Sequence, residues 1–308
     1  MITSPMPLIL DVDTGTDDAL ALAYAHANPR IELVAATTVA GNIGIEMATA
    51  NTLAVLDFVG ASNVPVYRGA SHPLVRPHRD AIYFHHENGM GGAQIPVSNR
   101  EVGEYKGPAA IIRLAKQRPG EITLICLGPL TNLAIALNVE PGITDLLAGV
   151  ALMGGAYNVP GNTTPAAEFN ILVDPEAAEQ VFAAPFKRLT AVGLDVTEQV
   201  RLTSDDWKHA LENAATLHPT ASLLGEVGRF AYGELGRDSF ALHDPLAVAT
   251  ALQPDLVSRE DAAIAVDTTS GDNLGQTRIV GPGRTQVAIA VDAERALRDF
   301  RDTVGLTI

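Results

Sequence analysis

The sequence alternates between strand-like and helix-like stretches, and this alternation restricts the fold more than any other feature. An apolar stretch over residues 7–13 predicts a buried strand, and residues 17–28 predict the helix that follows it. The same pattern predicts further strands at 31–39, 64–69, 121–128, 149–155 and 187–197, and helices at 43–60, 108–118, 132–139 and 174–184. Such alternation is typical of an α/β fold whose open, mostly parallel sheet is flanked by helices.

The pattern changes after residue 200. Residues 204–235 predict two or three helices, and residues 244–252 predict another. Later strands are expected at 262–267, 277–281 and 285–292, with a last helix at 294–304. Turn residues in SGDN and GPGR favour antiparallel pairing of these strands. We therefore expect a single domain over residues 1–308, with a C-terminal helical insertion and late antiparallel strands.

Composition and charge narrow the classes of partner. Hydrophobic residues make up 47% of the chain, which indicates a globular protein with a large core. The formal net charge of −15 disfavours nucleic acid and anionic membranes as partners and leaves small molecules and metal cations. No apolar run is long enough to span a bilayer, and the N-terminus does not resemble a signal peptide. Cys126 is the only cysteine, which fits the reducing cytoplasm.

Four carboxylates follow the first expected strand, in the stretch DVDTGTDD. They are Asp11, Asp13, Asp17 and Asp18. Ligands of parallel α/β sheets bind at the carboxyl ends of the strands, which is where this stretch lies. Turn and helix-capping chemistry would explain one or two aspartates, whereas four converging carboxylates need a cation, protonation or several hydrogen-bond donors. Oxygen ligands suit Ca²⁺ or Mg²⁺, so the stretch predicts a metal site.

Other polar clusters follow later strands. Asn42, taken alone, is more typical of a helix cap than of a binding site. The loop 161–170 could bind sugar hydroxyls or be an ordinary polar loop. His243 and Asp244 open an apolar helix, where they could be a surface residue and a cap, or an acid–base group and an oxygen ligand. The glycine-rich stretch 84–92 predicts a flexible loop that could act as a lid over a site. The spacing of its histidines matches no zinc-binding pattern.

Taken together, these motifs resemble the inosine-uridine preferring nucleoside hydrolase family. The matching stretches, in the family's order, are DVDTGTDD (11–18, with Thr14 in place of the family's proline), AGN (40–42), LGPLTN (127–132), AEFN (167–170), DPEAA (174–178), LDVT (194–197) and HDPLA (243–247). The resemblance implies a Rossmann-like nucleoside hydrolase fold and a tightly bound Ca²⁺. It also implies hydrolysis of the N-glycosidic bond of ribonucleosides to ribose and a free nucleobase.

The resemblance also implies roles for individual residues. Ca²⁺ would be held by the carboxylates of Asp13, Asp18 and Asp244 and by the backbone carbonyl of Leu127, with Asp11 supporting this loop. Asp13 would take a proton from the attacking water, and His243 would act as an acid toward the leaving base. The residues expected to bind the ribose are Asp17, Asn42, Asn162, Glu168 and Asn170. His85 and the stretch 229–240, with Tyr232 as its candidate, would contact the base.

His243 suggests a pyrimidine or inosine-uridine preference over strict purine specificity. The family forms dimers and tetramers, so we expect a homodimer or homotetramer, located in the cytoplasm and acting in nucleoside salvage.

Two alternative functions stay open. One is a Mg²⁺-dependent phosphohydrolase of the haloacid dehalogenase type, although that motif requires Thr or Val where this chain has Gly15. The other is a non-catalytic calcium- or nucleoside-binding protein with the same fold.

Overall fold

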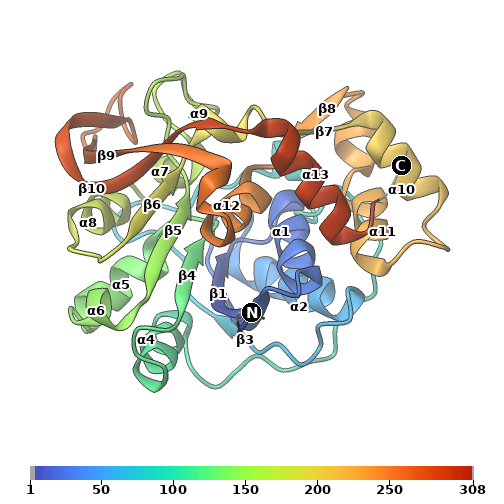
Figure 1. Cartoon of the computed structure of the whole chain (residues 1–308), viewed down its shortest axis with the longest axis horizontal. Helices are drawn as coiled ribbons and strands as arrows, with labels where there is room; N and C mark the ends of the chain where they lie inside the picture. Colours follow the sequence, from blue (N-terminus) through green and yellow to red (C-terminus); the bar gives the residue numbers. More distant parts are fainter. Residues whose placement is uncertain (1–3, 307–308) are drawn as a thin grey trace.

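A computed structural model describes residues 4–306 and contains one eight-stranded sheet at its centre (Figure 1). The strands follow the order β3-β2-β1-β4-β5-β6-β10-β9, and every pair is parallel except β9 with β10. Their bounds are β1 Met6–Val12, β2 Ile31–Thr38, β3 Val66–Arg68, β4 Thr123–Cys126, β5 Gly149–Met153, β6 Leu189–Val192, β9 Val257–Val266 and β10 Thr277–Val291. The predicted mostly parallel α/β fold is therefore confirmed.

Helices cover both faces of this sheet. One layer contains α1 Thr16–Ala27, α2 Ile45–Phe58, α11 Pro219–Val227, α12 His243–Leu252 and α13 Ala293–Val304. The opposite layer contains α4 Gly107–Gln117, α5 Thr131–Val139, α6 Ile143–Leu146 and α8 Pro175–Ala183. Within β1, Leu8 and Leu10 join the core of the first layer, whereas Ile9 joins the core of the second. Because strand side chains alternate between faces, a strand covered on both sides can carry apolar residues at consecutive positions, as residues 8–10 do.

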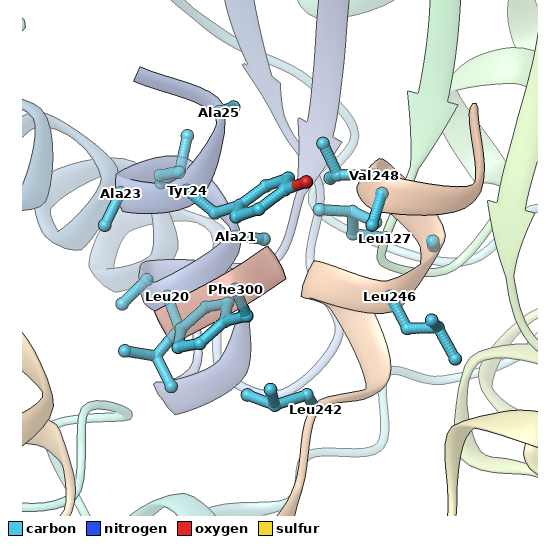
Figure 2. Close-up of a cluster of buried hydrophobic side chains, with 14 of the residues drawn as sticks. Leu20, Ala21, Ala23, Tyr24, Ala25, Leu127, Leu242, Leu246, Val248 and Phe300 are labelled. Atoms are coloured by element: carbon cyan, nitrogen blue, oxygen red, sulfur yellow. The ribbon is translucent and has the colours of Figure 1, made fainter. Parts of the chain in front are cut away.

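The first layer packs tightly around α1. Figure 2 shows Leu20 and Tyr24 of α1, Leu242 and Leu246 at the start of α12, and Phe300 of α13 in one buried cluster. The rings of Tyr24 and Phe300 stack with their centroids 6.0 Å apart. This packing fixes the position of α1, and therefore of the aspartate-rich turn that begins it.

The structure differs from the expected strands in two places. The stretch expected as one strand over 187–197 ends at Val192, and Leu194–Thr197 forms the short helix α9. Its apolar residues are buried in both conformations, so a short apolar run does not distinguish strand from helix. The stretches 277–281 and 285–292 belong to one strand, β10, because GPGR forms a bulge: Gly281 pairs with Ala263, and Thr285 pairs with the next residue, Ala262.

The remaining elements lie outside the eight-stranded sheet. They are α3 Ile82–His85, α7 Phe169–Val173, β7 Arg201–Thr203, α10 Ser204–Glu212, the π-helix η1 Arg229–Glu234, β8 Ser239–Ala241 and the 3₁₀ turn η2 Pro254–Leu256. Strands β7 and β8 form a separate antiparallel pair. The helical insertion expected over 204–235 is confirmed as α10, α11 and η1. Over residues 4–306, no helix has the length and apolar character needed to cross a membrane.

The strand order also defines where a ligand can bind. β1 lies beside β2 on one side and β4 on the other, so the chain first winds outward to β3 and then returns past β1. Such a reversal opens a crevice at the carboxyl ends of the two central strands. The residues that follow these strands are Asp13 and Leu127.

Candidate active site

A cavity of about 330 Å³ lies at the carboxyl ends of the strands. Polar side chains in its lining come from the turns after β1, β2 and β5 and from the start of α12. These are Asp17, Asn42, Asn162, Glu168, Asn170 and Asp244, together with Leu127. The lining also contains His85, His243, Tyr83, Phe84, Phe169, Phe240, Glu198, Arg201 and Arg237. A volume of this size accommodates a small polar molecule that carries one aromatic ring.

The aspartate-rich turn is organised around Asp18. The backbone N–H groups of Asp13 and Gly15 donate to its two carboxylate oxygens, at 3.1 Å and 2.9 Å. Asp18 is the third residue of α1, so these bonds resemble a capping box at a helix N-terminus. The local sequence therefore explains why the turn closes and why Asp17 and Asp18 both face its interior.

Asp13 is fully buried beside this turn, and its two oxygens differ. Oδ2 accepts a hydrogen bond from the backbone N–H of Asn42 at 2.6 Å. Oδ1 has no hydrogen-bond partner among the described residues. Burial and the nearby Asp18 raise the pKa of Asp13 well above its usual range. A buried, unpartnered carboxylate oxygen requires a ligand, a proton or a cation.

Three carboxylates offer oxygens to one point: Asp17, Asp18 and Asp244 each have an atom within 4.8 Å of the others. Burial, together with the neighbouring Asp17 and Asp18, raises the pKa of Asp244 well above its usual range, and burial raises the pKa of Asp17 to about 7. Negative charges on these carboxylates repel one another, and a bound divalent cation compensates them. The three carboxylates therefore fit a hard metal ion. The three carboxylates that lie within this distance include Asp17. The resemblance instead implied that Asp13 binds the metal together with Asp18 and Asp244.

Asp11 lies behind the turn, within hydrogen-bond distance of neighbouring strands and helices. Its Oδ1 accepts from Thr37 Oγ1 at 2.5 Å and from Asn132 Nδ2 at 2.7 Å. Its Oδ2 has no partner among residues 4–306, and burial raises the pKa of Asp11 to about 7. Asn132 belongs to the LGPLTN stretch, so this bond ties the β1 turn to the start of α5.

The loop before α7 brings three of the predicted residues to the cavity. Glu168 caps α7 and accepts from the backbone N–H groups of Gly155, Asn170 and Ile171, at 3.0, 2.9 and 3.1 Å. Asn170 Nδ2 donates to the backbone carbonyl of Leu127 at 2.7 Å. Asn162 Oδ1 accepts from the backbone N–H of Phe169 at 3.0 Å. These hydrogen bonds hold the polar side chains of the stretch 161–170 in a fixed arrangement.

Two histidines also line the cavity. His85 Nδ1 is 3.2 Å from the backbone nitrogen of Thr16, which donates to it. Burial lowers the pKa of His85 to about 3 and that of His243 to about 4, so both rings are neutral at pH 7. His243 Nδ1 lies 2.8 Å from Thr197 Oγ1 in the LDVT stretch.

Tyr232 lies outside the cavity. Its hydroxyl donates to the carbonyl of Leu202 at 3.0 Å, and its ring stacks on Trp207 with centroids 5.6 Å apart. The stretch 229–240 still reaches the cavity, through Arg237 and Phe240. Arg237 lies over the ring of Phe84, 4.5 Å from its centroid. Tyr232 is therefore a core residue in this structure, and we leave it out of the proposed site.

Sequence reasoning missed several lining residues, and Glu198, Arg201 and Arg237 are the charged ones. Glu198 and Arg201 follow the LDVT stretch directly, which was a usable signal because the chain around a matched motif usually lies near the same site. Arg237 lies in the stretch 229–240, which was expected to contact the base, but Tyr232 was the candidate named there.

Known proteins resemble this chain over nearly its whole length. The inosine-uridine preferring nucleoside hydrolase of Leishmania major is 38% identical over 301 residues, covering 94% of this chain and 95% of its own. The non-specific ribonucleoside hydrolase RihC of Salmonella agona is 37% identical over 299 residues, covering 95% of each chain. The solved structure of a purine-preferring ribonucleoside hydrolase from Gardnerella vaginalis superposes with a TM-score of 0.90 at 34% identity, covering 97% of this chain and 98% of its own.

With the fold and the cavity, these similarities define an enzyme that hydrolyses N-glycosyl compounds. The sequence model of the inosine-uridine preferring nucleoside hydrolases matches residues 8–298, and the chain belongs to that family. The matches favour neither the phosphohydrolase nor the non-catalytic binding protein considered above.

Gly41→Ala should lower kcat/KM by about 100-fold, because small displacements of catalytic groups cost this much. A Cβ at residue 41 would lie 2.0 Å from Asp13 Oδ2, so the carboxylate must move. Gly44→Ala is the matched control, since its Cβ would meet nothing within 4 Å. Steady-state kinetics on both variants checks the prediction, and equal losses in the two would contradict it.

Proposed function

We propose that the chain is a Ca²⁺-dependent ribonucleoside hydrolase that prefers pyrimidine nucleosides or inosine and uridine. Hydrolysis of ribonucleosides follows from family membership. The observation that carries the proposal is the lining of one cavity by converging carboxylates and by two neutral histidines with aromatic rings. The carboxylates and amides suit the hydroxyls of a ribose, and the histidines and aromatic rings suit a nucleobase.

The carboxylates of Asp13, Asp18 and Asp244 and the carbonyl of Leu127 would hold the ion, with Asp17 beside them. The unpartnered Oδ1 of Asp13 and the mutual approach of Asp17, Asp18 and Asp244 support this assignment. When bound, Ca²⁺ would orient the ribose hydroxyls and lower the pKa of a water molecule. Asp11, hydrogen-bonded to Thr37 and Asn132, would keep the β1 turn in place from behind.

Asp13 is our proposed general base. Asp13 is fully buried, and its Oδ1 has no partner among residues 4–306, so this oxygen is available to take a proton. Asn42 donates its backbone N–H to Oδ2 and so fixes the orientation of the carboxylate. The water would supply a hydroxyl group to C1′ while its proton passes to Asp13.

The ribose would be bound by Asp17, Asn42, Asn162, Glu168 and Asn170, which all line the cavity. Cleavage of the C1′–N bond generates positive charge on the sugar ring, as in other glycoside hydrolysis. Glu168 is held by three backbone N–H groups and is almost fully buried, so its carboxylate is preorganised to stabilise that charge.

His243 would assist the leaving base. The electron pair of the broken bond moves onto the base, and an N–H donor on the imidazole stabilises it. Overall, the water adds OH to the sugar and H to the base, so His243 ends the cycle unchanged. His85, Phe84 and Phe240 would enclose the base from other sides.

Incubation with uridine, cytidine, inosine and adenosine tests the proposal. We expect reducing ribose to be released from uridine or inosine with the highest kcat/KM, and little from adenosine. Release should stop when a chelator is added and return with Ca²⁺. Absence of ribose from all four nucleosides, together with phosphatase activity, would overturn the proposal. Cytoplasmic location and assembly as a homodimer or homotetramer stay predictions from the resemblance.

A further inference from the structure

Two consecutive residues lie at opposite edges of the His243 ring. Thr197 Oγ1 is 2.8 Å from Nδ1, and Glu198 Oε1 is 4.0 Å from Nε2. Thr197 is buried, whereas Glu198 lines the cavity. A neutral imidazole carries one N–H, and its position is decided by the groups that face the two nitrogens.

These two neighbours act differently on the imidazole. A threonine hydroxyl can either donate or accept, but a carboxylate can only accept. With the proton on Nε2, the Thr197 hydroxyl donates to Nδ1 and the N–H points toward Glu198. With the proton on Nδ1, the Nε2 lone pair would face a carboxylate, which is repulsive. The surroundings therefore favour the proton on Nε2.

Glu198 is itself held in place by Arg201. Arg201 Nη1 donates to Glu198 Oε2 at 2.6 Å, and Arg201 Nε donates to Ser239 Oγ on β8 at 2.8 Å. The second carboxylate oxygen, Oε1, is then the one nearest His243. The 4.0 Å separation exceeds a hydrogen bond, so the Nε2–H group stays available to a ligand in the cavity.

We propose that Glu198 is a positioning residue that selects the Nε2–H tautomer of His243, so that the imidazole presents a donor to the leaving nucleobase. The inference rests on the proposed function, because it assumes that His243 assists the leaving group. No proton is transferred in this step: the electron pair of the C1′–N bond moves to the base, and His243 stabilises it by a hydrogen bond.

Kinetics on two kinds of substrate tests the inference. Glu198→Gln keeps the shape but can present either an amide N–H or a carbonyl to Nε2, so the selection is lost. We expect kcat on uridine and inosine to fall about tenfold, the effect of about 1.4 kcal/mol, with KM little changed. An aryl riboside with 4-nitrophenolate as its leaving group needs no donor, so its kcat should be unchanged. Glu121→Gln is the control, because Glu121 also pairs with an arginine three positions away, Arg118, but does not line the cavity.

A spectroscopic measurement reports the tautomer without turnover. The ¹⁵N shifts of His243, assigned by their loss in His243→Ala, should show a protonated Nε2 and an unprotonated Nδ1 in the parent protein. Glu198→Gln should shift both nitrogens toward a mixture of the tautomers. Identical shifts in the two proteins would overturn the inference.

The double variant separates the possible failures. Glu198→Gln should have no further effect on nucleosides once His243→Ala is present. If Glu198→Gln still lowers kcat in the His243→Ala background, Glu198 has a structural role and the inference is wrong. The same holds if Glu198→Gln lowers kcat equally on the aryl riboside. If His243→Ala itself leaves kcat on nucleosides unchanged, the leaving-group role in the proposed function is wrong, and the inference falls with it. If His243→Ala lowers kcat on nucleosides and Glu198→Gln does not, the inference is wrong but the proposed function stands.

Discussion

Asp13→Ala should abolish measurable turnover, with a loss in kcat of about 10³-fold or more, as expected when a general base is removed. Asp13 is a buried carboxylate that directly follows β1, and its Oδ1 has no partner among residues 4–306. The measurement is ribose release from uridine and inosine at saturating Ca²⁺. Saturation matters because Asp13 is also proposed as a ligand of the ion, so weaker binding of Ca²⁺ must not be mistaken for slower chemistry.

Two further variants make this result interpretable. Asp13→Asn keeps the shape of the side chain and removes its charge, and it should be as inactive as Asp13→Ala. Because charging Asp13 is unfavourable in the metal-free protein, Asp13→Asn should not lower the melting temperature measured in chelator. Asp145→Ala changes a carboxylate whose side chain is 79% exposed and should retain full activity. Activity in Asp13→Asn close to that of the parent would show that another group takes the proton.

Chelation should remove activity and should also make stability fall as pH rises. Burial raises the pKa of Asp11 and of Asp17 to about 7, against 3.8 for an ordinary aspartate. Between these values the folded state holds protons that the unfolded state has released. The stabilisation is complete below pH 4 and is lost as pH rises through 7. For one group, a shift of about three units corresponds to at most about 4 kcal/mol.

Thermal melting between pH 5 and pH 8 measures this effect. In chelator, the melting temperature should decrease across that range, and Ca²⁺ added at pH 8 should restore most of the loss. Asp11→Asn, whose amide oxygen can accept from both Thr37 and Asn132, should reduce the slope in chelator. A melting temperature that rises with pH in chelator would mean that the carboxylates are not held protonated in the metal-free fold.

Local sequence was sufficient for much of the fold. The apolar strands β1, β2, β4 and β5 were predictable because their residues are buried on both faces, and helices such as α8 because their patterns are uninterrupted. The errors fell where one local pattern is compatible with two structures. Leu194–Thr197 is apolar enough for a strand but forms α9, and GPGR has the residues of a hairpin turn but forms a bulge within β10.

The site divides in the same way. The stretch DVDTGTDD by itself predicted a cluster of carboxylates, because four aspartates within eight residues cannot lie far apart. Tyr232 was a reasonable candidate on its stretch of chain, yet its hydroxyl bonds to Leu202 and its ring stacks on Trp207. Arg237 and Phe240, from the same stretch, reach the cavity instead.

By itself, therefore, the sequence determined the order of strands and helices, the position of the aspartate-rich turn and the family to compare with, since these depend on residues close together in the chain. Only the tertiary structure decided which distant side chains meet. Asp244 approaches Asp17 because α12 packs against α1, and Glu198 faces His243 because α9 lies beside the start of α12. Such contacts depend on how whole elements bury their apolar faces, and no short stretch of sequence contains that information.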